Sequence, residues 1–237
     1  MIEFAGYQWR PSQPWGDYHP NAPDWWYDPG CVDVTDGVLR LQTRRHTRKV
    51  VTTRTKDDIV LEHTEHNNKI GVGLVSSEDP FTYGTFEADV MLPKGTGLFP
   101  AFWLYSATTW PPEIDIFEAW SRKSGMYTSK CLPYYSLASN VHYGEEPNHP
   151  HIKSKSHLVF KKFDECFINF RLEWTPDRIE IFYNGRSVRK VTDPSILKWF
   201  NKEPEMWIIF NNGIEEESLY TNDSVMQVKN FKYTPNV

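Results

Sequence analysis

The run at residues 113–118 reads EIDIFE and places three carboxyl side chains within six positions of an otherwise apolar segment. In a β-strand, alternate side chains point to opposite faces, so Glu113 and Asp115 share one face while the intervening isoleucines pack on the other. Glu118 falls out of this alternation. It joins the same face only if the strand contains one extra residue, which we expect as a β-bulge near Phe117. Carboxylates held together repel one another and raise a pKa, an arrangement typical of acid–base catalysis.

The spacing of the two glutamates narrows this chemistry. With the bulge, Glu113 and Glu118 lie about four strand steps apart, or roughly 13 Å between Cα atoms at ~3.3 Å per residue. A curved strand with both side chains leaning inward would bring the carboxyl groups to ~5–5.5 Å, the separation used by retaining glycosidases, whereas inverting enzymes need a wider gap. The alternative is a solvated strand face that happens to be acidic.

Tryptophans flank the acidic run. The segment 100–105 alternates with period two, which predicts a strand with Trp103 on the same face as the carboxylates. Trp110 precedes two prolines that lead into the acidic run, and Trp120 lies two residues beyond Glu118 on the same predicted face. Flat aromatic rings suit the apolar faces of sugars, so we expect Trp103, Trp110 and Trp120 to bind substrate. For any one of them, the alternative is ordinary core packing.

A further strand is predicted at residues 139–144, with Asn140 and His142 on one face. We expect both side chains in the cleft, where a histidine can hydrogen-bond a catalytic carboxylate and change its pKa. The alternative for His142 is an ordinary surface or core histidine. The aromatic run 25–27 could add a distal platform for sugar, although packing explains it equally well.

An ordered series of motifs covers nearly the whole chain and resembles glycoside hydrolase family 16. The motifs are YG at 83–84, LPKGTGLFPAFWL at 92–104, PEIDIFE at 112–118, LEWTPD at 172–177, YNG at 183–185 and IIFNNGI at 208–214. The resemblance implies an all-β fold, a concanavalin A-like jelly-roll sandwich of two antiparallel sheets with the sugar chain across a concave face. It also implies a single catalytic domain over residues 1–237.

The resemblance assigns roles to the carboxylates. Glu113 matches the nucleophile, Glu118 matches the general acid and base, and Asp115 lies between them to hydrogen-bond Glu113 and set the local charge. Further positions that match the cleft are Trp103, Trp110, His142 and Asn211. The bulged signature is similar to the branch that contains laminarinases, agarases, porphyranases and carrageenases.

Two departures from the family pattern concern ligands. Leu74 stands where many laminarinases have an arginine that contacts sugar. Lys229 stands where the family often has the aspartate of a structural calcium site, and calcium needs oxygen ligands. We therefore expect no metal and no cofactor, with structural calcium disfavoured.

Composition restricts the partners. A net charge of −5 and a pI near 5.9 speak against nucleic acid, and no apolar run is long enough to span a membrane. Basic residues within 44–49 and at Arg122-Lys123 would favour a sulfated substrate if they reached the cleft. Three cysteines without metal-ligand spacing allow at most one disulfide and require none. We expect a monomer.

The chain start lacks the pattern of a signal peptide. Because enzymes that act on polysaccharides usually work outside the cell, we expect a secreted, periplasmic or cell-surface protein from which a signal peptide has been removed. Turns are predicted at 36–37, 184–185 and 211–213, and a short helix at 193–200 with Asp193 as its cap and Pro194 in its first turn.

Together these features predict a retaining endo-β-glycanase that acts on a polysaccharide. The substrate stays open between a β-galactan (agarose, porphyran or carrageenan) and a β-1,3-glucan (laminarin). Leu74 and the basic clusters favour the galactan. The alternatives are a non-catalytic carbohydrate-binding lectin, which would need the aromatic residues without two glutamates at catalytic separation, and a transglycosylase on the same scaffold.

Overall fold

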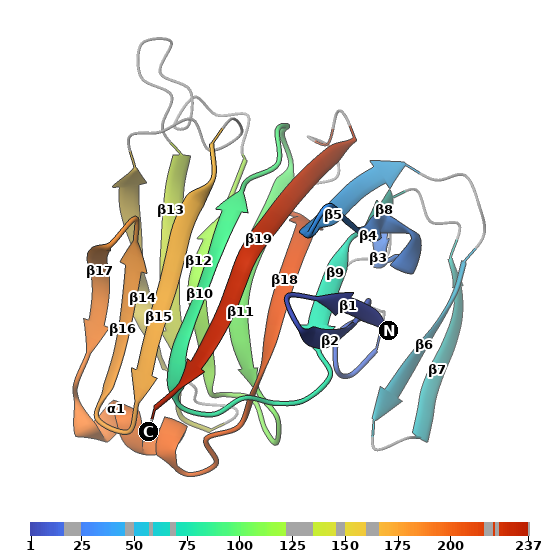
Figure 1. Cartoon of the computed structure of the whole chain (residues 1–237). Coiled ribbons are helices and arrows are strands. Elements are labelled where there is room, and N and C mark those ends of the chain that lie inside the picture. The colour runs from blue at the N-terminus through green and yellow to red at the C-terminus, as the bar shows by residue number, and fades with distance from the viewer. Residues whose placement is uncertain are drawn as a thin grey trace.

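The computed structural model of the chain describes residues 1–16, 25–45, 50–56, 59–66, 70–121, 135–145, 150–159, 166–215, 220 and 223–236. Two large β-sheets pack face to face, and the described residues contain one α-helix (Figure 1). The predicted all-β jelly-roll sandwich is therefore confirmed. That residues 1–237 form one domain stays a prediction.

The first sheet carries the acidic run. All its neighbouring strands are antiparallel. In spatial order its eight strands are β1 (Ile2–Phe4), β2 (Tyr7–Arg10), β9 (Leu74–Ser77), β18 (Met206–Ile214), β11 (Leu98–Ser106), β12 (Glu113–Ala119), β13 (Tyr135–His142) and β14 (His151–Val159).

The second sheet packs against the core-facing side of the first. Its nine strands are β17 (Arg186–Val191), β16 (Arg178–Tyr183), β15 (Ile168–Thr175), β10 (Gly84–Met91), β19 (Ser224–Pro235), β5 (Val38–Arg45), β8 (Ile70–Val72) and β3 (Trp25–Tyr27), with β4 (Val32–Thr35) paired to β5. Only β3 and β8 run parallel among these pairs. A separate hairpin, β6 (Val50–Lys56) and β7 (Ile59–His66), lies at the right of Figure 1, and a 3₁₀ turn (Pro29–Cys31) precedes β4.

The core lies between the two sheets and fixes which side chains face outward. On β11, Phe102 and Leu104 are fully buried in it, opposite buried residues of β10 such as Phe86. Burying a large apolar side chain contributes about 1.5–3 kcal/mol, so a slip of one residue would be costly. The alternate residues of β11, including Trp103, therefore project from the other face, as predicted.

The predicted turns at 36–37 and 184–185 and the predicted helix cap are present in the structure. Asp36 and Gly37, like Asn184 and Gly185, have positive φ and form hairpin turns between paired strands. The helix α1 spans Pro194–Asn201, and its cap is the predicted one, with Asp193 Oδ1 accepting a hydrogen bond from Ser195 N at 2.9 Å.

The predicted turn at 211–213 is wrong, because these residues lie within β18. Their turn-like composition has other causes. The Asn212 amide donates to Leu41 O at 3.1 Å, which connects the two sheets. A Cβ at Gly213 would lie 2.9 Å from Phe99 O, so the close approach of strands favours glycine there.

Among the described residues, no helix combines the length and apolar character needed to cross a membrane.

Candidate active site

The predicted bulge is present in β12. Asp115 pairs with Trp103 and Phe117 pairs with Phe102, so Ile116 is the extra residue opposite β11. Ile116 and Phe117 both turn into the core and are fully buried. The extra residue returns Glu118 to the face of Glu113 and Asp115, as predicted.

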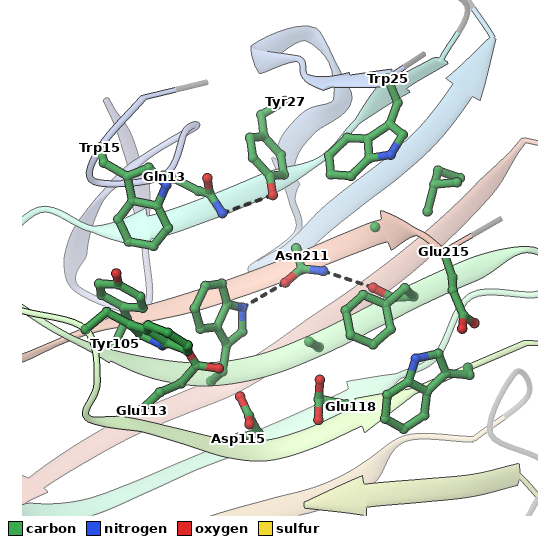
Figure 2. A pocket seen from close by; sticks show the side chains of 17 residues that line it. Gln13, Trp15, Trp25, Tyr27, Tyr105, Glu113, Asp115, Glu118, Asn211 and Glu215 are labelled. Atoms are coloured by element: carbon green, nitrogen blue, oxygen red, sulfur yellow. Dashed lines mark hydrogen bonds between the residues drawn. The ribbon is translucent and has the colours of Figure 1, made fainter. Parts of the chain in front are cut away.

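All three carboxylates line one open cavity of about 590 Å³ (Figure 2). The cavity crosses the outer face of β12, β11 and β18 to the N-terminal segment, where Gln13, Trp15, Tyr27 and Trp25 face the carboxylates. Its lining residues are Gln13, Trp15, Trp25, Tyr27, Phe99, Ala101, Trp103, Tyr105, Trp110, Glu113, Asp115, Glu118, Trp120, Asn211, Gly213, Ile214 and Glu215. Among these described lining residues there are four acids and no lysine or arginine.

Glu113 is held by two neighbours. Trp110 Nε1 donates to Glu113 Oε2 at 2.7 Å, and His142 Nε2 lies 3.8 Å from the other carboxyl oxygen. Burial raises the pKa of Glu113 well above its ordinary value, and the nearby charge of Asp115 adds to this. His142 and the Trp110 hydrogen bond act in the opposite direction by favouring the ionised form.

Asp115 lies deepest of the three. Its side chain is 3% exposed, and His142 Nε2 lies 3.2 Å from its Oδ2. Burial raises the pKa of Asp115 well above its ordinary value, and the charge of Glu118 raises it further. The hydrogen bond with Glu113 and the charge of Arg189 oppose that rise.

Glu118 has the environment of a proton donor. Burial and then the charge of Glu113 raise its pKa to about 7, while a hydrogen bond from Asn140 Nδ2 to Glu118 Oε2 limits the rise. A general acid works best when its pKa lies near the working pH, so Glu118 is suited to exchange protons at neutral pH.

Aromatic side chains form the floor and the ends of the cavity. Trp103 Nε1 donates to Asn211 Oδ1 at 2.8 Å, and the Asn211 amide donates to Phe99 O at 3.0 Å. Asn211 therefore fixes the ring of Trp103. At the Glu118 end, the rings of Phe99 and Trp120 lie 5.3 Å apart, tilted by 32°.

Comparison with known proteins gives the family. The sequence model described as "Glycosyl hydrolases family 16" matches residues 23–227. The chain belongs to glycosyl hydrolase family 16. The predicted resemblance is therefore confirmed.

Individual relatives are distant. The endo-1,3-1,4-beta-glycanase ExsH of Rhizobium meliloti is 22% identical over 81% of this chain and 38% of its own length. The beta-1,3-glucan-binding protein 1 of Galleria mellonella is 29% identical over 48% of this chain and 23% of its own length. This chain thus spans less than two thirds of these relatives. The structure of a family 16 endo-glucanase from Bacteroides ovatus superposes with a TM-score of 0.67 at 22% identity, covering 94% of this chain and 92% of that one, and this likeness concerns the fold.

In this family 16 protein, the predicted site residues divide into two groups. The cavity is lined by Trp103, Trp110, Trp120 and Asn211 together with the three carboxylates. Asn140 and His142 do not line it, but both contact carboxylates from β13. Their geometry suits orienting the carboxylates more than touching sugar.

On the far wall of the cavity, Gln13 and Trp15 are not predicted from the sequence. The main chains of Gln13 and Gly16 exchange two hydrogen bonds of 3.1 Å, and this turn presents Trp15, whose ring lies 4.3 Å from that of Tyr105. Gln13 Nε2 donates to Tyr27 Oη at 3.0 Å. Trp15 and Gln13 precede the matched region 23–227, and no local motif marks them. In the run 25–27, Trp25 and Tyr27 line the cavity whereas Trp26 is buried.

The described part of the basic cluster at 44–49 points elsewhere. Arg44 donates to Gly30 O at 2.7 Å, and the guanidinium of Arg45 lies 5.3 Å from the centre of the Tyr220 ring. Residues 46–49 and Arg122-Lys123 lie outside the described residues, as does Cys131. Cys166 is an exposed free thiol, and the buried Cys31 Sγ lies 3.8 Å from Asp28 Oδ2.

Ligand atoms of Glu113, Asp115 and His142 lie within 4.8 Å of one another, close enough to hold a metal ion. At the family's calcium position, Lys229 Nζ instead lies 4.0 Å from the centre of the Phe167 ring. The absence of a required metal or cofactor stays a prediction.

Proposed function

We propose that the protein is a retaining endo-β-glycanase with Glu113 as nucleophile and Glu118 as general acid and base. The observation that carries this proposal is the bulge at Ile116, which places both glutamates in one cavity with the pKa of Glu118 near 7. A strand with regular alternation would bury one of them in the core.

In the first step, a Glu113 carboxylate oxygen attacks the anomeric carbon while Glu118 protonates the departing glycosidic oxygen. Glu113 must be ionised to attack. Trp110 and His142 favour its ionised form, whereas the charge of Asp115 and the hydrogen bond between the two acids raise the pKa of Glu113. Protonation of Asp115, whose own pKa is raised by burial, would remove that opposing charge. The role of Asp115 is therefore to carry a proton beside the nucleophile.

In the second step, Glu118 removes a proton from water, which attacks the anomeric carbon and releases Glu113. The same electrostatics helps here. Once Glu113 is esterified it is neutral, and the charge that raised the pKa of Glu118 is gone. Glu118 then becomes the stronger acid, ionises at neutral pH and acts as the base. Two displacements at one carbon give net retention.

For the substrate we propose a neutral β-glucan with 1,3 or mixed 1,3-1,4 linkages. Four carboxylates and no described cation line the cavity, so the sulfate esters of carrageenan or porphyran would meet repulsion. Arg44 and Arg45, which had favoured a sulfated galactan, are engaged away from the cavity. The name of ExsH, an endo-1,3-1,4-beta-glycanase, supports the same choice.

The test is a reducing-end assay against laminarin, mixed-linkage glucan, agarose, porphyran and carrageenan, with Glu113→Gln as control. We expect activity on laminarin or mixed-linkage glucan that disappears in Glu113→Gln, with proton NMR of the first product showing retention. Activity confined to a sulfated galactan would overturn the substrate proposal. An inverted first product would overturn the mechanism.

A second candidate is a carbohydrate-binding protein without catalysis, which the Galleria beta-1,3-glucan-binding protein favours by its name. It predicts equal binding of laminarin by the unchanged protein and Glu113→Gln, with no reducing ends formed by either. A third, transglycosylation, would appear as elongated products from labelled oligosaccharide acceptors.

We further propose that the protein works outside the cytoplasm as a monomer without a cofactor. Unchanged activity after dialysis against EDTA, and a mass of one chain in light scattering, are the expected results.

A further inference from the structure

Two polar side chains of the second sheet cross the core and reach the inner face of β12 and of its neighbour β13. They are Tyr183 at the end of β16 and Arg189 in β17, and they are 3% and 7% exposed. Burying a tyrosine hydroxyl and a guanidinium is unfavourable unless each is hydrogen-bonded, so their partners are informative.

Tyr183 bonds to the bulge itself. Its hydroxyl donates to Ile116 O at 2.8 Å and lies 3.4 Å from Ala138 O. Ile116 is the extra residue, and a bulge interrupts the hydrogen-bond ladder where the extra residue is inserted. Ala138 is the residue of β13 that pairs with Glu118. The hydroxyl therefore bridges β12 and β13 at the point where their register changes.

Arg189 holds the facing strand. Its Nε donates to Ser139 Oγ at 2.9 Å, and its Nη2 donates to Ser139 O at 2.7 Å. Ser139 lies opposite the bulge, between Ala138 and Asn140, and the latter pairs with Asp115 and donates to Glu118. Two bonds to one residue fix both its backbone and its side chain.

We propose that Tyr183 and Arg189 are positioning residues that lock the bulge and thereby set the place of Glu118 relative to Glu113. This inference rests on the proposed glycanase function. Neither residue lines the cavity. Arg189 also supplies a buried positive charge to the carboxylates. Asp115 faces Glu113 and Glu118 on its own strand, His142 on β13 and Arg189 from β17, and the charge of Arg189 favours its ionised form.

The chain offers a matched control for Tyr183. Tyr220 is also 3% exposed, and its hydroxyl donates to a main-chain carbonyl, Thr43 O, at the same 2.8 Å, but Tyr220 does not line the cavity. Tyr183→Phe and Tyr220→Phe each remove a phenol-to-carbonyl hydrogen bond, and Tyr220→Phe also removes the contact of 3.1 Å between Tyr220 Oη and Asp223 Oδ1. If Tyr183 has only a structural role, the two variants should have the same activity when they have the same stability.

We expect Tyr183→Phe to lower kcat by about 10-fold or more with KM changed less than about twofold, because small displacements of a catalytic group have large effects on rate. Tyr220→Phe should leave kcat within about twofold. NMR titration of the Glu118 carboxyl gives a second readout that needs no substrate. Its pKa, about 7 in the unchanged protein, should fall in Tyr183→Phe, where Glu118 is freer to reach solvent, and stay in Tyr220→Phe.

Arg189→Met tests the charge, with Arg189→Lys as the conservative partner. Loss of the cation should raise the pKa of Asp115 in an NMR titration, and lysine should restore part of the shift. Ser139→Ala, which removes the hydroxyl that accepts the Arg189 Nε hydrogen bond and keeps the cation, serves where an Arg189 variant does not fold.

Equal kcat and equal Glu118 titration in Tyr183→Phe and Tyr220→Phe would overturn the proposal, as would superimposable Asp115 titrations for Arg189→Met and the unchanged protein. Failure of the glycanase function would look different. The unchanged protein would then cleave no glucan, while the NMR titrations would still report whether Tyr183 positions Glu118.

Discussion

Three buried carboxyl groups and one histidine share a small volume, so the charge on each depends on the protons held by the others. His142 Nε2 lies 3.2 Å from Asp115 and 3.8 Å from Glu113, and both acids have pKa values well above their ordinary range because of burial. Not all three acids ionise together near neutral pH. The protein can thus keep one carboxylate as a nucleophile only by leaving protons on its neighbours.

The nucleophile assignment predicts chemical rescue. Glu113→Ala should lower kcat by about 10³-fold or more, because the covalent step is lost while the cavity remains. Azide can occupy the vacated space and attack the anomeric carbon, giving a glycosyl azide of inverted configuration. Mass spectrometry and NMR of the product check this. Near-native hydrolysis by Glu113→Ala would contradict the assignment, and Asp193→Asn, a change at the exposed N-cap of helix α1, controls for general damage.

The acid–base assignment predicts a pH profile. Because Glu118 must be protonated in the first step and its pKa is about 7, kcat/KM should fall as the pH rises above about 7. In Glu118→Gln, the residual activity on a substrate with an activated leaving group, which needs no protonation, should lose this basic limb. An unchanged basic limb in Glu118→Gln would assign it to another group.

The far wall of the cavity predicts a length-dependent contribution to binding. Trp15 stacks near Tyr105 and faces the cavity, so Trp15→Ala should raise KM for long oligosaccharides by about 10-fold, as expected for loss of about 1–2 kcal/mol of ring contact. Substrates too short to reach Trp15 should be unaffected. Trp25→Ala gives a comparison at the other side of Tyr27. Equal loss on short and long substrates would indicate a structural role for Trp15.

At the scale of elements, the sequence predicted the parts that depend on local periodicity. The alternation in β11, the bulge in β12 and the cap of α1 can all be predicted from residues that are neighbours in the sequence. The prediction of a turn at 211–213 failed because the two asparagines there donate to Phe99 and Leu41 on other strands and Gly213 lies close to the Phe99 carbonyl, contacts that no local pattern reveals. Trp15 and Gln13 were missed for the same reason, since tertiary folding alone brings them opposite the carboxylates.

The bulge predicts the effect of a one-residue deletion. Removing Ile116 would restore regular alternation in β12 and leave Glu113, Asp115 and Glu118 on the cavity face, but it would take one residue out of the span between the two glutamates. It would also remove a fully buried side chain and the carbonyl that accepts a hydrogen bond from Tyr183, at a cost of about 2–5 kcal/mol. We expect a deletion variant with a lowered melting temperature and with kcat lowered by about 10-fold or more, because the two glutamates are displaced relative to each other. Ile116→Val keeps the bulge. It should leave activity unchanged and lower the free energy of unfolding by only about 1 kcal/mol, as is typical of this substitution.

A deletion variant that folds with native stability and hydrolyses glucan would show that β12 reaches its catalytic geometry without the extra residue. Circular dichroism melting and the reducing-end assay make both measurements on the same preparations.

At the scale of the whole molecule, the second sheet does more than cover the apolar face of the first. It supplies Tyr183 and Arg189 to the underside of the bulge, and β5 connects to β18 through Asn212. The cavity is therefore built on strands whose register is fixed from behind. Rigid strands position catalytic groups more accurately than loops do.

The buried acids also predict how stability depends on pH. The pKa of Glu118 is raised from 4.5 to about 7, so the folded state binds this proton more tightly than the unfolded state. Stability from this group is fully present below about pH 4.5 and is lost as the pH rises from there to about 7. At about 1.4 kcal/mol per pKa unit, reduced for partial exposure, the loss is on the order of 2 kcal/mol.

Glu118→Gln removes this titration, so its stability relative to the unchanged protein should rise between about pH 4.5 and 7 and stay level above that. Urea unfolding at a series of pH values measures the difference. Asp193→Asn is the control, because the pKa of Asp193 is lowered by its capping hydrogen bonds and its linkage has the opposite sign. The free energy of unfolding of Asp193→Asn should differ from that of the unchanged protein by a constant amount over the same pH range, because Asp193 is already ionised there in the folded and in the unfolded chain. A flat difference for Glu118→Gln as well would mean that Glu118 titrates alike in the folded and unfolded chains, and the electrostatic basis for its role as acid would be lost.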